Sequence, residues 1–196
     1  MSKDWIYDCE TYPNVFTLAI EHADSPLRFA FEISDTRNDS RAIVDFIDWL
    51  RNDSGRMVGF NNIGFDYPIL HTLIRMGKSD ANTLYQKAQA IINSQDEADR
   101  WMHQVNPSDR VVTQIDLFKI HHFDNKARAT SLKVLEFNMR SENIEDLPFK
   151  VGTNLNAAEI EVLKKYNQHD VSETKIGRAH VWTPVTFLYL VCRLLL

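Results

Sequence analysis

The chain has 196 residues and is 44% hydrophobic, which suits one globular domain. Its six glycines and six prolines exclude a low-complexity sequence. The formal net charge of −5 excludes a protein that holds nucleic acid by bulk positive charge alone, although carboxylates that bind metal ions could still meet phosphate groups.

The cysteines and the two ends of the chain indicate where such a protein works. Cys9 and Cys192 lie far apart without metal-type spacing, so we expect a reducing, cytoplasmic setting. The first residues lead straight into a strand pattern without the apolar run of a signal peptide. Residues 186–196 are apolar, but they are interrupted by Arg193 and are too few for a bilayer span of about 20 residues. We therefore expect no membrane association.

Three strands are predicted first, followed by a helix. Strand-forming residues occupy positions 5–8, 15–20 and 28–33, with turn residues at 12–14 and 23–26. Three successive strands with short turns predict an antiparallel meander. Apolar residues at helical spacing then predict a helix over 43–50, with Asp39 or Ser40 as its cap.

Helices and buried strands alternate in the rest of the chain. Strands are predicted at 57–60 and 111–117, and helices at 66–76, 81–92, 131–137 and from 157 to about 175, the last capped by Asn156. Residues 95–110 are polar and predict an exposed connection. This order predicts an α/β fold with a mixed sheet flanked by helices, and no domain boundary before Lys175.

Two carboxylates end the first predicted strand. Asp8 and Glu10 are two residues apart, so strand geometry directs both side chains to one face. Such a pair is normally solvated. Here the preceding Trp, Ile and Tyr indicate a buried strand, where adjacent carboxylates repel unless a cation lies between them. The pattern therefore favours a divalent metal.

Two later motifs carry further acidic residues, and each has an ordinary structural interpretation on its own. Asp66 ends the run Asn61-x-x-x-Phe65-Asp66 and could simply cap the helix that follows. Tyr166 and Asp170 are four apart on the last helix, a spacing common on exposed helix surfaces.

Together and in this order, the three motifs resemble the DEDD exonuclease superfamily, whose fold is the ribonuclease-H-like mixed sheet with an antiparallel meander and added parallel strands. Tyr166 places the resemblance in the tyrosine subtype. The match spans residues 5 to about 175. Residues 115–117 and 129–133 are similar to the segment between the second and third motifs of phage and other replicative DNA polymerases, which favours a proofreading domain.

The resemblance implies a 3′–5′ exonuclease that hydrolyses the DNA 3′ end with two Mg²⁺ or Mn²⁺ ions. The metal ligands would be Asp8, Glu10, Asp66 and Asp170, with Tyr166 positioning the attacking water. An RNA or oligonucleotide exonuclease and a non-catalytic DNA-binding module remain as alternatives. A polymerase domain, in the same chain or as a separate subunit, is the expected partner, and a phage the expected source.

Substrate contacts are expected from several other residues. Asn61 and Phe65 would shape the pocket for the terminal nucleotide, by analogy with the family, although Phe65 could equally belong to the core. Basic residues between the second and third motifs are candidates for phosphate contacts, and they are Lys119, Lys126, Arg128 and Lys133.

The C-terminal stretch from about Ile176 resembles a translated sequencing-library adapter. Residues 176–186 match its in-frame translation with TGA read as Trp, and residues 189–196 match the adjoining flow-cell segment. We therefore expect the exonuclease domain to occupy residues 1–175 and residues 176–196 to be a non-native tail that lowers solubility. The alternative is a genuine hydrophobic anchor or dimer helix.

Overall fold

The structure is a computed structural model, and it describes residues 3–94, 97–121 and 147–182. Five strands form one mixed sheet in the order β3-β2-β1-β4-β5. The meander consists of β1 (Asp4–Tyr12), β2 (Val15–His22) and β3 (Arg28–Ser34), and β4 (Arg56–Gly59) and β5 (Thr113–Asp116) add in parallel on the other side of β1. The predicted α/β fold is confirmed, and it is consistent with a ribonuclease-H-like sheet.

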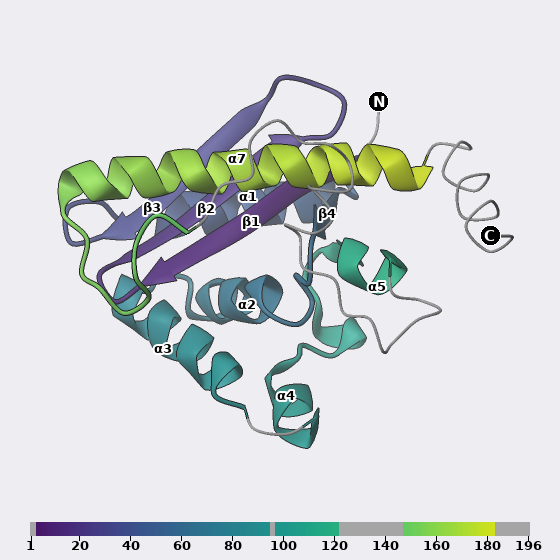
Figure 1. Cartoon of the computed structure of the whole chain (residues 1–196). Coiled ribbons are helices and arrows are strands. Elements are labelled where there is room, and N and C mark those ends of the chain that lie inside the picture. The colour runs from purple at the N-terminus through teal and green to yellow at the C-terminus, as the bar shows by residue number, and fades with distance from the viewer. Residues whose placement is uncertain (1–2, 95–96, 122–146, 183–196) are drawn as a thin grey trace, which may run out of the picture.

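Helices cover both faces of this sheet (Figure 1). The long helix α7 (Ala157–Trp182) crosses one face, antiparallel to β1. The other face packs on α1 (Ser40–Asn52), α2 (Asp66–Met76) and α3 (Ala81–Ile92), and these three helices share one large apolar cluster with the odd-numbered side chains of β1. None of the helices in the described ranges is both long and apolar enough to cross a membrane.

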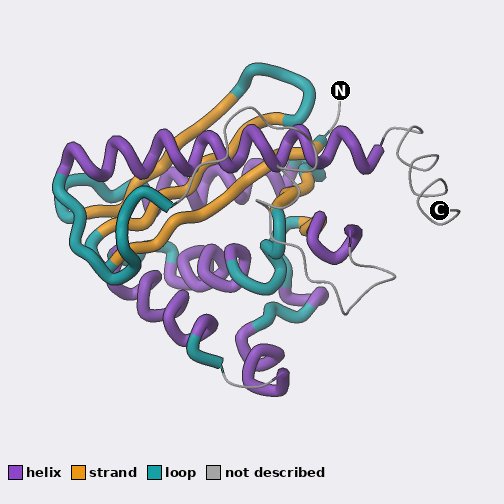
Figure 2. The backbone as a smooth tube through the Cα atoms, in the orientation of Figure 1, coloured by secondary structure: helices purple, strands orange, loops and turns teal. Residues whose placement is uncertain are grey.

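Most predicted elements are confirmed, and three differ in detail. The predicted exposed connection contains α4 (Glu97–His103) and a 3₁₀ turn at Pro107–Asp109, and the end of the fifth predicted strand is the short helix α5 (Leu117–His121) (Figure 2). The last helix continues seven residues beyond Lys175. The predicted helix at 131–137 lies outside the described residues.

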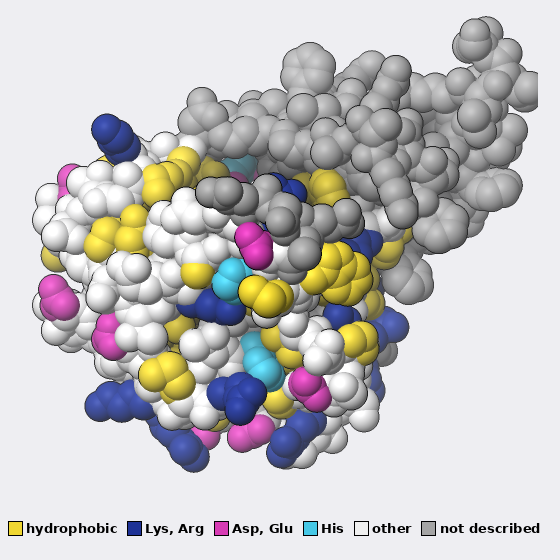
Figure 3. Space-filling view, turned by 90° about the horizontal axis from the view of Figure 1, so that it is seen from below, with side chains coloured by type: hydrophobic (Ala, Val, Ile, Leu, Met, Phe, Trp, Pro, Cys, Tyr) yellow, Lys and Arg dark blue, Asp and Glu magenta, His cyan; other side chains and the backbone are white. Residues whose placement is uncertain are grey.

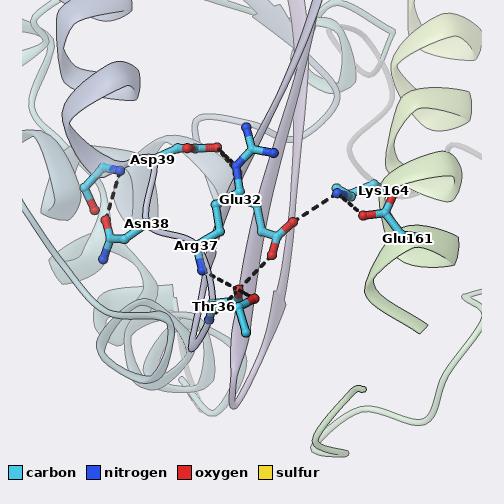
Figure 4. Close-up of polar contacts among 9 residues, drawn as sticks. Glu32, Thr36, Arg37, Asn38, Asp39, Glu161 and Lys164 are labelled. Atoms are coloured by element: carbon cyan, nitrogen blue, oxygen red, sulfur yellow. Dashed lines mark hydrogen bonds and ion pairs between the residues drawn. The ribbon is translucent and has the colours of Figure 1, made fainter. Parts of the chain in front are cut away.

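The two predicted helix caps behave differently. The side chain of Asn156 accepts hydrogen bonds from the N–H groups of Ala158 and Glu159, so this cap is confirmed. Asp39 occupies the N-cap position of α1, but its carboxylate does not cap the helix. It accepts the N–H of Glu32 and pairs with Arg37 at 2.8 Å, so the loop after β3 uses it instead (Figure 4).

Alternation along β1 divides its side chains between the two faces. Trp5, Tyr7 and Cys9 enter the apolar cluster under α1–α3. Ile6 packs in a separate cluster with Val171 of α7, on the opposite face. The even-numbered residues therefore face α7, and this parity places the acidic residues of β1 beneath one helix.

Polar contacts anchor α7 along its length. Lys164 bonds Glu32 of β3 at 3.0 Å, and Figure 4 shows this lysine reaching from the helix to the strand. About three turns further on, Lys175 bonds Glu21 of β2 at 2.5 Å. Near its end Arg178 pairs with the fully buried carboxylate of Asp4, at the start of β1. These contacts fix the position of α7 over the sheet.

Candidate metal centre

Three carboxylates from β1 and α7 converge at one point. Asp8, Glu10 and Asp170 each offer an oxygen, and these three oxygens lie within 4.8 Å of one another. Asp8 and Glu10 share the face of β1 that α7 covers, as their spacing predicted. Asp170 enters from α7, and all three side chains are partly exposed. This cluster could bind a metal ion.

Asp66, at the start of α2, is close enough to this cluster to act on the charges of Asp8 and Glu10. The parallel pairing of β1 and β4 ends at Ile6 and Val58, and the chain then turns into α2, whose first residue is Asp66. Its buried carboxylate accepts a backbone hydrogen bond from Cys9, and its charge raises the pKa of both Asp8 and Glu10. Asp66 is not in the group of three oxygens, but it is their electrostatic neighbour.

The acidic residues strongly disfavour one another's ionised forms. Burial, followed by repulsion from Asp170 and Asp66, raises the pKa of Glu10 to about 8. Burial raises the pKa of Asp66 to about 7, and burial and three acidic neighbours raise that of Asp8 well above its ordinary value. The charged groups that raise these pKa values are themselves carboxylates. A cation bound among them would relieve this repulsion.

Tyr166 lies one helical turn before Asp170 and is hydrogen-bonded to it. Burial and the surrounding carboxylates raise the pKa of the phenol above its ordinary value, so the hydroxyl keeps its proton at neutral pH. Tyr166 can therefore donate a hydrogen bond and orient a neighbour, but it is a poor base.

Asn61 and Phe65 flank a tight loop before α2. Asn61 has a φ of 58°, in the left-handed region that asparagine adopts in turns, and its side chain is exposed. Phe65 is partly buried and packs against the large apolar cluster. Much of its side chain therefore belongs to the core, which was the alternative to a role in the nucleotide pocket.

A residue that the sequence did not indicate organises this loop. The buried carboxylate of Asp116, at the end of β5, accepts hydrogen bonds from the backbone N–H groups of Asn61, Ile63 and Phe118 at 2.9–3.3 Å. The sequence segment around Asp116 was noted for its resemblance, but no local pattern reveals that it reaches a loop 55 residues earlier.

The remaining basic candidates are only partly placed. Lys126, Arg128 and Lys133 lie outside the described residues, and Lys119 is exposed on α5. The surface on the side of α2 and α3 mixes acidic, basic and apolar side chains (Figure 3). This view therefore shows no uniformly positive track for a nucleic-acid backbone among the described residues.

The cluster offers the kind of ligand atoms that hard divalent cations prefer. Its ligand atoms are carboxylate oxygens that carry excess negative charge. Oxygen ligands of this kind suit Mg²⁺ or Mn²⁺, whereas nitrogen and sulfur ligands are typical of zinc sites. The residues present therefore fit a metal of this class. No family model, curated protein or solved structure matches the chain.

Proposed function

We propose that this protein is a metal-dependent 3′–5′ exonuclease that removes nucleotides from DNA 3′ ends. The observation that carries the proposal is the convergence of Asp8, Glu10 and Asp170, with Asp66 as their electrostatic neighbour. Four acidic side chains from a strand, a helix start and a distant helix have no evident structural purpose together, because they destabilise one another.

The proposed cofactor is a pair of Mg²⁺ or Mn²⁺ ions. When bound, such ions polarise the phosphoryl group and neutralise charge on the attacking and leaving oxygens of an in-line displacement. Asp8 is central among the candidate ligands, because Glu10, Asp66 and Asp170 all act on its charge. As the resemblance implies, Asp8, Glu10, Asp66 and Asp170 would together hold the ions.

Tyr166 contributes position rather than proton abstraction. Its protonated hydroxyl is tied to Asp170, at the edge of the acidic cluster. In this place it can hold the attacking water in line with the scissile bond, which is a large part of catalysis when the reacting atoms must be aligned. Asn61 and Phe65 are the candidate contacts to the terminal nucleotide, together with Lys126 and Arg128 as candidate phosphate contacts.

The sequence resemblance is the basis for proposing DNA as the substrate and proofreading as the role. The order of the three motifs and the segment around Asp116 are similar to replicative polymerases, so we infer a polymerase domain as partner and a phage-infected bacterial cytoplasm as setting. The sheet order β3-β2-β1-β4-β5 and the crossing helix α7 are compatible with that resemblance.

Hydrolysis of labelled oligonucleotides tests the proposal directly. DNA and RNA strands of one sequence, labelled at the 5′ end, are incubated with the protein in Mg²⁺, Mn²⁺ or EDTA. We expect DNA to shorten from its 3′ end only with added metal. RNA cleaved faster than DNA would move the assignment to an RNA exonuclease.

Two variants distinguish hydrolysis at the proposed site from hydrolysis by a contaminating nuclease and from loss of activity through misfolding. Asp8→Ala removes the central ligand and should lower the rate by at least about 10³-fold, since one carboxylate of a metal cage is lost. Asp45→Ala is the matched control, because Asp45 is an exposed residue of α1 that pairs with Arg41. Equal rates for the two variants would contradict the proposal.

A further inference from the structure

Asn167, to which no motif assigned a role, lies on α7 where this helix contacts the sheet beside Asp8. It directly follows Tyr166 on α7 and is 1% exposed. Its Nδ2 donates a hydrogen bond of 2.7 Å to Oδ2 of Asp8, and its Oδ1 accepts a bond of 3.4 Å from Oγ1 of Thr17. The amide thus connects a helix to two adjacent strands, β1 and β2.

The two contacts determine which way the amide points. A carboxylate that binds a metal ion is ionised and can only accept hydrogen bonds, so the nitrogen of Asn167 faces Asp8. Thr17 is 1% exposed and can give its proton to the amide oxygen, which faces away from the cluster. Asn167 therefore offers a donor, and not a metal-ligating oxygen, to the acidic side chains.

We propose that Asn167 is a positioning residue, which holds the Asp8 carboxylate so that its remaining lone pairs point to the cation; this inference rests on the exonuclease function proposed above. Without the amide, Asp8 would be free to rotate away from Glu10 and Asp170, because repulsion from its acidic neighbours favours separation. Groups that orient metal ligands in this way typically affect metal affinity by about 10- to 100-fold.

Other contacts of α7 with the sheet allow the positioning role of Asn167 to be tested apart from the stability of the fold. Lys164 anchors the helix one turn before Asn167, and Ser172 and Lys175 bond Glu21 beyond it. We therefore expect the helix to keep its place when one amide is removed. Ser172 gives a matched control, since it also connects α7 to β2 but bonds Glu21 and the carbonyl of Gln168 rather than a metal-site carboxylate.

The test measures binding of Mn²⁺ alone by isothermal titration calorimetry, on the wild type and on Asn167→Ala and Ser172→Ala. We expect Asn167→Ala to raise the Mn²⁺ dissociation constant about 10- to 100-fold, and Ser172→Ala to leave it within about threefold. Thr17→Val removes the hydroxyl that orients the amide at almost constant volume, and we expect a weaker loss in the same direction. Thr17→Val carries the test if Asn167→Ala does not fold.

The activity assay adds a second measurement. Excess Mn²⁺ should restore much of the hydrolysis rate of Asn167→Ala, because the defect lies in ion affinity. Equal Mn²⁺ affinities for wild type, Asn167→Ala and Thr17→Val would overturn the positioning role while leaving the exonuclease proposal intact. A wild type that neither binds Mn²⁺ nor hydrolyses DNA would overturn both.

Discussion

In metal-free solution the protein should lose stability as the pH rises from 5 to 9, and Glu10 should account for much of the loss. The pKa of Glu10 is raised from 4.5 to about 8 in the folded protein. Between these values the folded protein holds a proton that the unfolded chain has released. Stability from this group is therefore complete below the unfolded pKa and declines as the pH passes through the folded pKa.

The size of the effect follows from the pKa difference. A rise of about 3.5 would correspond to nearly 5 kcal/mol at about 1.36 kcal/mol per pH unit. Because the Glu10 side chain keeps some contact with solvent, we expect a loss on the order of 2–4 kcal/mol. For a domain of this size, that is a decrease in the melting temperature of roughly 4–16 °C.

The assay compares melting temperatures of the wild type and Glu10→Gln in EDTA at pH 5 and pH 9. The glutamine cannot ionise, so the variant should match the wild type at pH 5 and melt at a higher temperature at pH 9. Mn²⁺ at 100 times its dissociation constant should then stabilise the wild type at pH 9 by about 2.7 kcal/mol. Identical melting temperatures for both proteins at both pH values would refute the reasoning.

Three further changes test other parts of the structure. Tyr166→Phe removes the hydrogen bond to Asp170 and should slow hydrolysis roughly 10- to 100-fold through misalignment, with Mn²⁺ affinity by calorimetry nearly unchanged; full activity would exclude the phenol from the reaction. Asp116→Ala leaves three backbone N–H groups without their acceptor and should cost about 2–3 kcal/mol in urea unfolding; an unchanged midpoint would show that the loop is held otherwise. Arg178→Ala should cost about 1–3 kcal/mol by the same measurement, since Asp4 keeps its bond to Arg56. A chain ending at Lys175 should share this loss while being more soluble, and equal stability of both chains would contradict the role of Arg178.

Local pattern was sufficient for most of the fold. Helical spacing placed α2 and α3 at the residues where the structure has them, because each helix buries one apolar stripe against a single cluster. Strand alternation also predicted that Asp8 and Glu10 share a face. That Asp170 joins them followed only from the family resemblance, since no local signal connects residues 160 positions apart.

The features that the sequence did not predict depend on contacts between segments that are far apart in the chain. Asn167 contributes to the site through Asp8 and Thr17, which lie about 150 residues earlier, so its neighbours in sequence give no indication of its place. The last helix continues through Gly177, a weak helix former, and Arg178 beyond it pairs with buried Asp4. The non-native origin of residues 176–196 stays a prediction from their sequence.

The parity of β1 also determines what kinds of change this protein can tolerate. Asp8 and Glu10 of this strand face the helix α7, whereas Trp5 and Tyr7 at the alternate positions enter the apolar cluster on the opposite face of the sheet. Inserting or deleting a single residue between Trp5 and Asp8 would reverse the faces of the side chains beyond the change. Carboxylates would then enter the apolar core, and aromatic side chains would lie among the candidate metal ligands. Evolution of this strand can therefore proceed by substitution far more readily than by a change of length.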